Sequence, residues 1–281
     1  MTTSKYYKLR DSKFINISGA DRSTFLQSLI TNDINKCDPK TPIYSCLLSP
    51  QGKFIADFFI INCIDSYLIE IHKNFFDDFL KKIDLYKLQA KIKVKNLESF
   101  KSLFLIKNNN FFEKEENIFI FDDPRKNDLG IKIYVKKNNI DEFINKYSLI
   151  ENDFDKYREL LIKNLIPYST EDLVKNKSLL LENNFENLNA IDWNKGCYIG
   201  QEITARMKYR ALLKKSIKSV EVIEGNINTG DRIFLEKNNI GEVISSFKNF
   251  GIAMLNIEQT NEVIKKNINL KTDSADLKIM I

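Results

Sequence analysis

The segment WNKGCYIGQEITARMKYR, residues 193–210, is the most unusual stretch of the chain and decides how the rest is interpreted. Gly196 and Gly200 permit a tight turn and a close approach of backbone to a ligand. Cys197 lies between them and follows Lys195, and nearby positive charge favours the reactive thiolate. From the residues alone, the segment is either a site built around a reactive thiol or a glycine-rich turn around a buried structural cysteine.

Length and composition indicate an ordinary globular protein. The chain has 281 residues, enough for two or three domains, and its 43% apolar content excludes a mainly disordered protein. Its apolar runs are shorter than the ~18 residues that span a bilayer, and the N-terminus lacks the apolar core of a secretory signal. The net charge of +5 is too small to indicate nucleic-acid binding. We therefore expect no membrane partner and no direct nucleic-acid partner.

Histidine and cysteine usage excludes several kinds of site. His72 is the single histidine, so a multi-histidine metal site within one chain is impossible, and we expect a structural role for it. The four cysteines form no C-x-x-C pair, which argues against a disulfide framework or a zinc ribbon. Reduced thiols in a cytosol-like compartment are expected. Cys37, Cys46 and Cys63 lie in apolar or turn segments and are interpreted as packing residues.

Apolar patterning predicts the elements of the N-terminal half. Residues 13–17 alternate like a half-buried strand, and Ser18 with Asp21 resembles a capping box that begins a helix. The inward face predicted for that helix is Phe25, Leu26, Leu29 and Ile30. A helix over 74–84 has the predicted inward residues Phe75, Phe76, Phe79, Leu80 and Ile83. Further strands are predicted over 43–48, 54–61, 67–71, 91–97, 102–106, 117–121 and 132–135.

The C-terminal half changes in texture. Helices are predicted over 141–147 and 153–164, and Pro167 ends the second one. The mixture of helices and strands over 66–148 suits a ferredoxin-like α+β domain. After Lys215, short strands separated by glycine-containing turns predict a small all-β barrel or sandwich.

The string KGCYIGQE, followed by TAR, resembles the signature of the YgfZ family of folate-binding proteins. That family includes mitochondrial iron–sulfur assembly relatives and is similar in fold to the aminomethyltransferase (T-protein) of glycine cleavage. Three further blocks resemble family motifs in the same order: FINISGADRSTFLQSLITNDI (14–34), LLSPQGKFIADFFI (47–60) and LLENNF (180–185). The resemblance therefore covers residues 14–210.

The resemblance implies an α+β fold of three domains in a ring around a channel that binds tetrahydrofolate. Residues 1–48 and 149–212 would form a discontinuous folate-binding domain that carries the signature. Residues 49–148 would form the ferredoxin-like domain, and residues 213–281 the C-terminal β-barrel.

The resemblance also implies particular site residues. Cys197 is expected to be the functional thiol at the mouth of the channel and a possible shared cluster ligand, with Lys195 beside it. The predicted folate contacts are Tyr157, Glu182, Asn184 and Arg206. The signature residues are Lys195, Gly196, Cys197, Tyr198, Gly200, Gln201 and Glu202. The chain departs from the family pattern at Ser12, Leu161, Leu165 and Ala211.

Three functions remain open from the sequence. The leading one is a cytoplasmic, tetrahydrofolate-binding accessory protein for iron–sulfur cluster assembly or repair, with assembly proteins or client enzymes, including those of tRNA modification, as partners. One cysteine cannot hold a cluster, which takes about four thiolate-type ligands, so any cluster would be transient and shared through Cys197. The alternatives are a folate-dependent aminomethyltransferase or demethylase, and a protein-binding scaffold whose channel is vestigial.

Overall fold

The computed structural model describes residues 4–106, 112–113, 115–210 and 212–280, so Ala211 lies outside the described residues. The chain divides into two compact units, each built from several chain segments. The first unit comprises Met1–Pro50, Ile55–Phe154 and Asn187–Gln201, and the second comprises Gln51–Phe54, Asp155–Glu186 and Glu202–Ile281. The three-domain boundaries given above stay a prediction.

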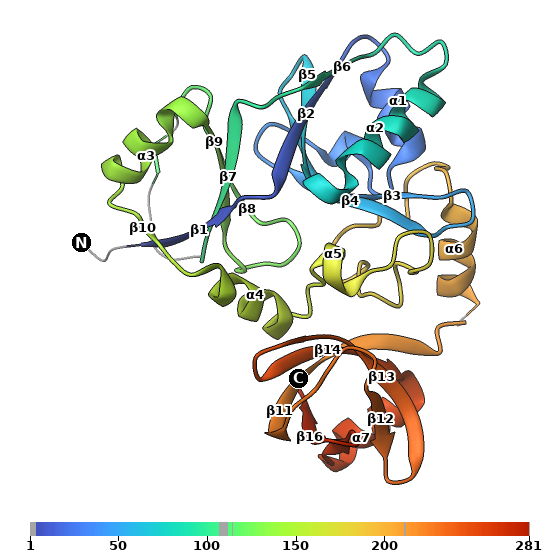
Figure 1. Cartoon of the computed structure of the whole chain (residues 1–281). Helices are drawn as coiled ribbons and strands as arrows, with labels where there is room; N and C mark the ends of the chain where they lie inside the picture. Colours follow the sequence, from blue (N-terminus) through green and yellow to red (C-terminus); the bar gives the residue numbers. More distant parts are fainter. Residues whose placement is uncertain (1–3, 107–111, 114, 211, 281) are drawn as a thin grey trace. The chain divides into compact units, whose positions relative to one another are not determined.

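Two five-stranded sheets dominate the first unit (Figure 1). One has the order β3-β4-β5-β2-β6, and its β2–β5, β2–β6 and β4–β5 pairs are antiparallel. Its strands are β2 (Ser12–Ser18), β3 (Ile43–Leu48), β4 (Phe54–Asn62), β5 (Ser66–His72) and β6 (Lys93–Asn96). The other has the order β10-β1-β7-β9-β8, with only the β1–β10 pair parallel. Its strands are β1 (Lys5–Leu9), β7 (Phe100–Leu105), β8 (Phe119–Asp122), β9 (Ile131–Lys136) and β10 (Ile150–Glu151).

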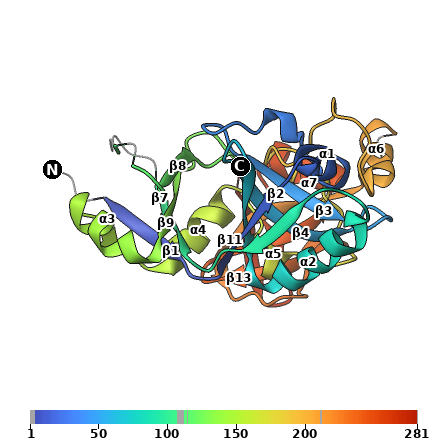
Figure 2. The same ribbon diagram turned by 90° about the horizontal axis from the view of Figure 1, so that it is seen from above.

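The helices of this unit pack by their apolar faces. In α1 (Arg22–Leu29), Phe25, Leu26 and Leu29 are buried as predicted. In α2 (Lys73–Lys87) the buried residues are Phe75, Phe79 and Ile83, whereas the predicted Phe76 and Leu80 are only half-buried at the edge of that face. The ring of Phe79 meets Phe58 of β4 edge-on, at 5.0 Å between centroids. The helix α3 (Ile140–Lys146) packs Ile140 and Phe143 against β7 and β9, beside which it lies in Figure 2.

The capping box predicted at Ser18 and Asp21 is wrong. Ser18 is the last residue of β2, and Asp21, at the N-cap of α1, makes no side-chain bond to the helix. Its carboxylate instead accepts a hydrogen bond from the Lys91 backbone N–H at 2.6 Å. The reason is a turn at Gly19, whose φ of +113° and close approach to the Lys91 carbonyl bring a distant segment against the start of the helix.

The second unit contains a closed six-stranded barrel of order β11-β14-β13-β12-β15-β16, which confirms the predicted C-terminal barrel. Its strands are β11 (Lys215–Gly225), β12 (Arg232–Leu235), β13 (Asn238–Phe247), β14 (Phe250–Asn256), β15 (Leu270–Lys271) and β16 (Ala275–Ile279). The helix α7 (Ile257–Lys266) was not predicted, although Asn256 caps it by accepting from the Gln259 N–H. Other helices are α4 (Phe154–Lys163), α5 (Ser169–Asp172) and α6 (Gln201–Tyr209). Among the described residues, no helix is both long and apolar enough to cross a bilayer.

Candidate functional site

The site is built where α1 ends, at Thr31, Asn32 and Asp33. The Thr31 hydroxyl donates to the Ala190 carbonyl at 2.6 Å, and the Thr31 carbonyl accepts from the Asp192 N–H at 3.0 Å. Both Thr31 and Asn32 are buried, so these bonds are shielded from water. These bonds hold the residues after α1 against the segment over 190–192, although the two are far apart in the sequence, and both belong to the first unit.

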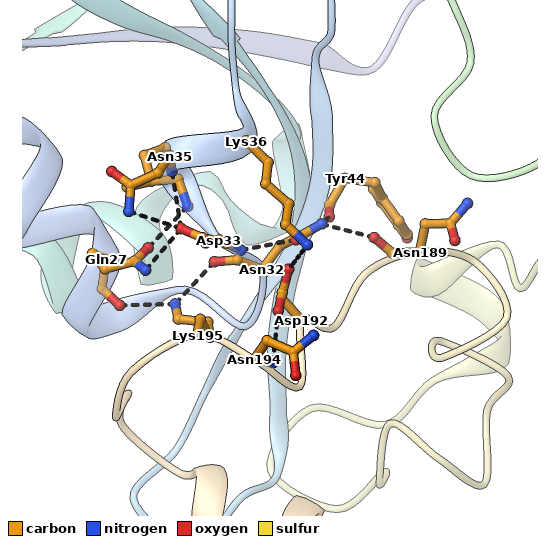
Figure 3. Close-up of polar contacts among 11 residues, drawn as sticks. Gln27, Asn32, Asp33, Asn35, Lys36, Tyr44, Asn189, Asp192, Asn194 and Lys195 are labelled. Atoms are coloured by element: carbon orange, nitrogen blue, oxygen red, sulfur yellow. Dashed lines mark hydrogen bonds and ion pairs between the residues drawn. The ribbon is translucent and has the colours of Figure 1, made fainter.

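Asn32 extends this connection. Its side-chain amide donates to the Tyr44 carbonyl at 2.8 Å and to the Asn189 carbonyl at 2.7 Å (Figure 3). Its side-chain oxygen, Oδ1, accepts a hydrogen bond from the Asp33 N–H at 2.8 Å. The side chain therefore uses both amide protons and its oxygen, which fixes its orientation between β3 and the segment before the signature.

Lys195 connects the signature itself to the end of α1. Its ammonium group donates to the backbone carbonyls of Gln27 at 2.8 Å and Asn32 at 2.9 Å (Figure 3). It also donates to the Ile30 carbonyl at 2.5 Å. An ammonium group has three N–H donors, so all of them are used. The carbonyls at a helix C-terminus lack helical partners, and a cation there also suits the helix dipole. Lys195 thus anchors the loop that carries Cys197.

The charge of Lys195 is sensitive to this environment. Burial lowers its pKa to about 8, although the nearby carboxylates of Asp33 and Asp192 act in the opposite direction. The ammonium also lies 4.9 Å from the centre of the Tyr198 ring, a cation–π distance. Because the three protons are committed to carbonyls, the arrangement supports a positioning role for Lys195.

Asp192 secures the other side of the loop. Its carboxylate forms an ion pair with Lys36 and accepts from the Asn194 N–H at 2.8 Å (Figure 3). Burial opposes ionisation of Asp192, but the bond from Lys36 and the backbone amides outweigh it and lower the pKa of this carboxyl. Asp192 therefore stays ionised and holds the turn that leads into the signature.

Cys197 lies at the exposed part of this anchored loop. Its side chain is solvent-exposed, as predicted for a functional thiol, whereas Cys37 and Cys46 are buried and Cys63 is half-buried. The next residue, Tyr198, is buried, and the Ile199 N–H donates to the Ser28 carbonyl at 3.1 Å. Residues on both sides of Cys197 are therefore held in place while the thiol stays accessible. Among the described residues, no three histidine, cysteine or acidic side chains are grouped to hold a metal.

The predicted folate contacts occupy different environments. Tyr157 on α4 is buried, and Arg206 on α6 is exposed. The Asn184 side chain donates to the Leu165 carbonyl at 2.8 Å, just after α4, so its amide nitrogen serves as a backbone cap. Asn184 itself has a left-handed φ of +68°. Convergence of these residues on one ligand stays a prediction.

Glu182 lines a cavity of about 830 Å³ in the second unit. Burial raises the pKa of Glu182 above its ordinary value, and the charges of Lys215, at 3.9 Å, and Lys53 offset this only in part. The volume lies within the ~300–1,000 Å³ of small-molecule sites. The other lining residues are Leu212, Lys214, Lys215, Gly230, Arg232, Asn239, Ile240, Gly241, Glu242, Met254, Asn256 and Gln259.

Sequence reasoning missed the partnership between Lys195 and the end of α1. In the sequence, Thr31, Asn32 and Asp33 belong only to the block over 14–34 that resembles a family motif. Lys195 and Asn32 are separated by 163 positions, so no local pattern relates them. Both the block over 14–34 and the segment over 193–210 contain residue types that often bond to backbone groups. That composition is the available signal, but it does not indicate which residues bond to each other.

The fold places the chain in a structural class. The whole chain is similar to the glycine cleavage system aminomethyltransferase T from Bartonella henselae, with a TM-score of 0.77 and 13% identity. The match covers 99% of this chain and 85% of that chain. At this identity the likeness concerns the fold alone, and it confirms the predicted α+β, T-protein-like class.

Sequence relatives give a narrower comparison. Proteins described as "iron-sulfur cluster assembly factor IBA57 homolog, mitochondrial" match from Coccidioides immitis (26% identity, 77% of this chain, 56% of the relative) and Neurospora crassa (28%, 75% and 52%). A Dictyostelium discoideum protein of the same description matches at 24% identity over 74% of this chain and 60% of its own length. The chain thus spans little more than half the length of these relatives. No family model matches. The homologues of this chain are therefore described as iron–sulfur cluster assembly factors. This confirms the predicted resemblance to iron–sulfur assembly proteins.

Proposed function

We propose that this protein is an accessory factor for iron–sulfur cluster assembly and that Cys197 is its working residue. The observation that carries the proposal is the exposed thiol on a loop whose neighbours are anchored by Lys195 and Asp192. The relatives named above carry the same kind of activity in their descriptions. A thiol that must reach a partner's cluster has to be accessible and well positioned.

A single thiolate defines what kind of contact is feasible. Iron–sulfur clusters take about four thiolate-type ligands, so Cys197 would supply one ligand and an assembly protein the others. The cluster is then cargo that is shared briefly between two chains. Loss of the Cys197 proton on binding would make the contact favour higher pH.

Complementation tests this proposal. In cells lacking the native protein, Cys197→Ser should fail to restore iron–sulfur enzyme activity while the variant accumulates to the normal level. Cys63→Ser, at a half-buried thiol, is the matched control and should restore activity. Full rescue by Cys197→Ser would remove the thiol from the mechanism.

The proposal also includes tetrahydrofolate binding at the cavity lined by Glu182. The residues fit in part: Glu182 is a half-buried carboxylate at a cavity of suitable size, and such a group can accept hydrogen bonds from a pterin. Lys214 and Arg232 in the same cavity offer cationic partners for an anionic tail. The Asn184 amide nitrogen is already committed to the Leu165 carbonyl, so it contributes less.

Calorimetric titration separates the possibilities. Tetrahydrofolate should bind and folic acid should bind more weakly, and Glu182→Gln should reduce the affinity of tetrahydrofolate about tenfold or more, since a charge-assisted hydrogen bond is lost. Tyr157→Phe, which preserves the buried ring, tests the contribution of that hydroxyl. Unchanged binding in Glu182→Gln would move the ligand away from this cavity.

A further inference from the structure

A strongly basic segment surrounds the C-terminal end of α2. Residues 81–95 contain six lysines and one acidic residue, Asp84, so this segment alone matches the net charge of +5 of the whole chain. The lysines are Lys81, Lys82, Lys87, Lys91, Lys93 and Lys95. Within the described part of the chain, none of them forms an ion pair with a carboxylate. Their charge is therefore available to an anionic partner.

Large apolar side chains protrude from the same region. Leu88, which caps α2, is 87% exposed, and Leu85 in the last turn is 58% exposed. Ile64, in the turn between β4 and β5, is 72% exposed and has a φ of +68°. A β-branched residue with positive φ is a conformational outlier, and here the strained residue points an apolar group into water.

Hydrogen bonds from the start of α1 bring Ile64 close to the basic segment. The Arg22 guanidinium donates to the carbonyls of Gly19 at 3.0 Å and Ile64 at 2.7 Å. The neighbouring Asp21 carboxylate accepts from the Lys91 N–H at 2.6 Å. Ile64 and Lys91 are thus held to one short segment, and Leu88 lies three positions before Lys91. All of these residues belong to the first unit.

We propose that this lysine–leucine surface binds anionic lipid bilayers peripherally. Leu85, Leu88 and Ile64 would insert among the lipids, and the six lysines would face the anionic headgroups. Lysine-rich faces with protruding leucines are typical of segments that lie in a bilayer interface. Lysine is depleted from protein–protein interfaces, and such interfaces bury roughly 800 Å² per partner around a core poor in charge. The composition therefore favours a lipid surface over an acidic protein.

A simpler interpretation of the lysines explains less of this surface. Lysines on β6, an edge strand, also protect a sheet from pairing with another chain. That role accounts for Lys93 and Lys95 but not for the exposed Leu85 and Leu88. The sequence-based expectation of no membrane partner concerned spanning segments, and this proposal revises it for peripheral contact.

Vesicle flotation of the full chain tests the proposal. Binding should occur to mixed phosphatidylcholine/phosphatidylglycerol vesicles, not to phosphatidylcholine alone, and it should weaken as salt is raised. The double variant Leu85→Ser/Leu88→Ser should lose more than about tenfold in binding, since two apolar insertions disappear. Lys87→Gln/Lys91→Gln should lose roughly twenty-fivefold, because each lysine near an anionic surface contributes roughly fivefold.

Matched variants elsewhere control for general effects of charge and apolarity. Ile223→Ser/Ile268→Ser removes exposed apolar residues of the second unit, and Lys136→Gln/Lys137→Gln removes charge at the C-terminal end of β9. Both should bind vesicles like the original chain. Equal binding to the two vesicle types, or equal loss in the controls, overturns the proposal. So does binding to soluble polyglutamate without vesicle binding, because the surface would then serve an acidic protein.

Discussion

At the scale of single residues, Lys195 is the most consequential side chain in the signature. Its three carbonyl contacts lie in a protected site, and a buried group deprived of a charged hydrogen-bond partner costs free energy. Lys195→Met should lower the free energy of unfolding by about 2–3 kcal/mol, measured by urea denaturation. Lys126→Met, at an exposed lysine of the same unit, should change it little. Equal midpoints for the two variants would contradict the anchoring role.

The four thiols should differ sharply in reactivity. Burial raises the pKa of Cys37 to about 12 and holds that of Cys46 well above its usual value, whereas Cys197 is exposed. A water-soluble aromatic disulfide should therefore label one thiol rapidly in the native protein, since the thiolate is the attacking form. Cys197→Ser should abolish the fast phase without loss of stability, and Cys46→Ala should cost about 1–3 kcal/mol. Fast labelling that persists in Cys197→Ser would refute the assignment.

At the scale of elements, one carboxylate connects the two sheets of the first unit. Glu70 on β5 accepts from the Tyr134 hydroxyl at 2.7 Å and pairs with Lys132 at 2.7 Å, both on β9. It also accepts from the Ser12 hydroxyl at 2.6 Å. Glu70→Ala should destabilise the chain by about 3–5 kcal/mol because Lys132 stays buried without its partner. Addition of Lys132→Met should restore much of this loss in a thermal melt, and a purely additive double variant would contradict the coupling.

The contribution of the Glu70–Lys132 pair to the free energy of unfolding depends on pH in a direction that follows from the pKa of Glu70. Burial opposes ionisation of Glu70, yet Lys132 outweighs it and lowers the pKa below the ordinary 4.5. The pair therefore stabilises the fold above that value, and the contribution is lost as the pH falls through the lower folded-state pKa. Acid unfolding of Glu70→Gln should accordingly show a weaker dependence on pH below about 4.5.

The single histidine caps a helix. The Nδ1 atom of His72 accepts from the Asn74 N–H at 3.1 Å at the start of α2, which requires an unprotonated nitrogen. Burial lowers the pKa of His72 below 6.5, although Asp11 acts in the opposite direction. This cap is fully present above pH 6.5 and is lost as the pH falls through the lower folded-state pKa. The one histidine resonance in a proton NMR titration should report that pKa, and a midpoint above 6.5 would contradict it.

At the scale of the whole molecule, α4 and the barrel belong to one compact unit. Ile162 of α4 packs with Ile217, Ile252 and Met254 of the barrel, and the Ser219 hydroxyl donates to the Ile162 carbonyl. Ile162→Ala should lower the stability by about 2–4 kcal/mol through a cavity. Hydrogen exchange should then accelerate in β11 and β14 and stay unchanged in β2 and β5. Uniform acceleration in all four strands would show that the chain unfolds as a single cooperative body.

Local patterning determined most of the elements. The alternation over 13–17 corresponds to β2 and the apolar face of 74–84 to α2, because each period reflects burial of one face. The continuous apolar run over 54–61 corresponds to β4, which is buried on both faces. The turn-rich texture after Lys215 corresponds to the barrel. The helix α7 escaped because its short polar sequence is helical mainly through its cap and its packing on the barrel.

The sequence by itself determined the T-protein-like class, the C-terminal barrel and the position of the unusual loop. Only the tertiary structure decided what Lys195 does, because its carbonyl partners are backbone groups that every residue carries. It also decided that Asp21 bonds to Lys91 and that Asn184 caps α4, since both depend on turns with positive φ. Exposure of Cys197 was predicted from its chemistry, but the bonds from its neighbours Lys195 and Ile199 to the end of α1 are long-range contacts. Such contacts depend on how distant segments meet, and no local period of the sequence records that.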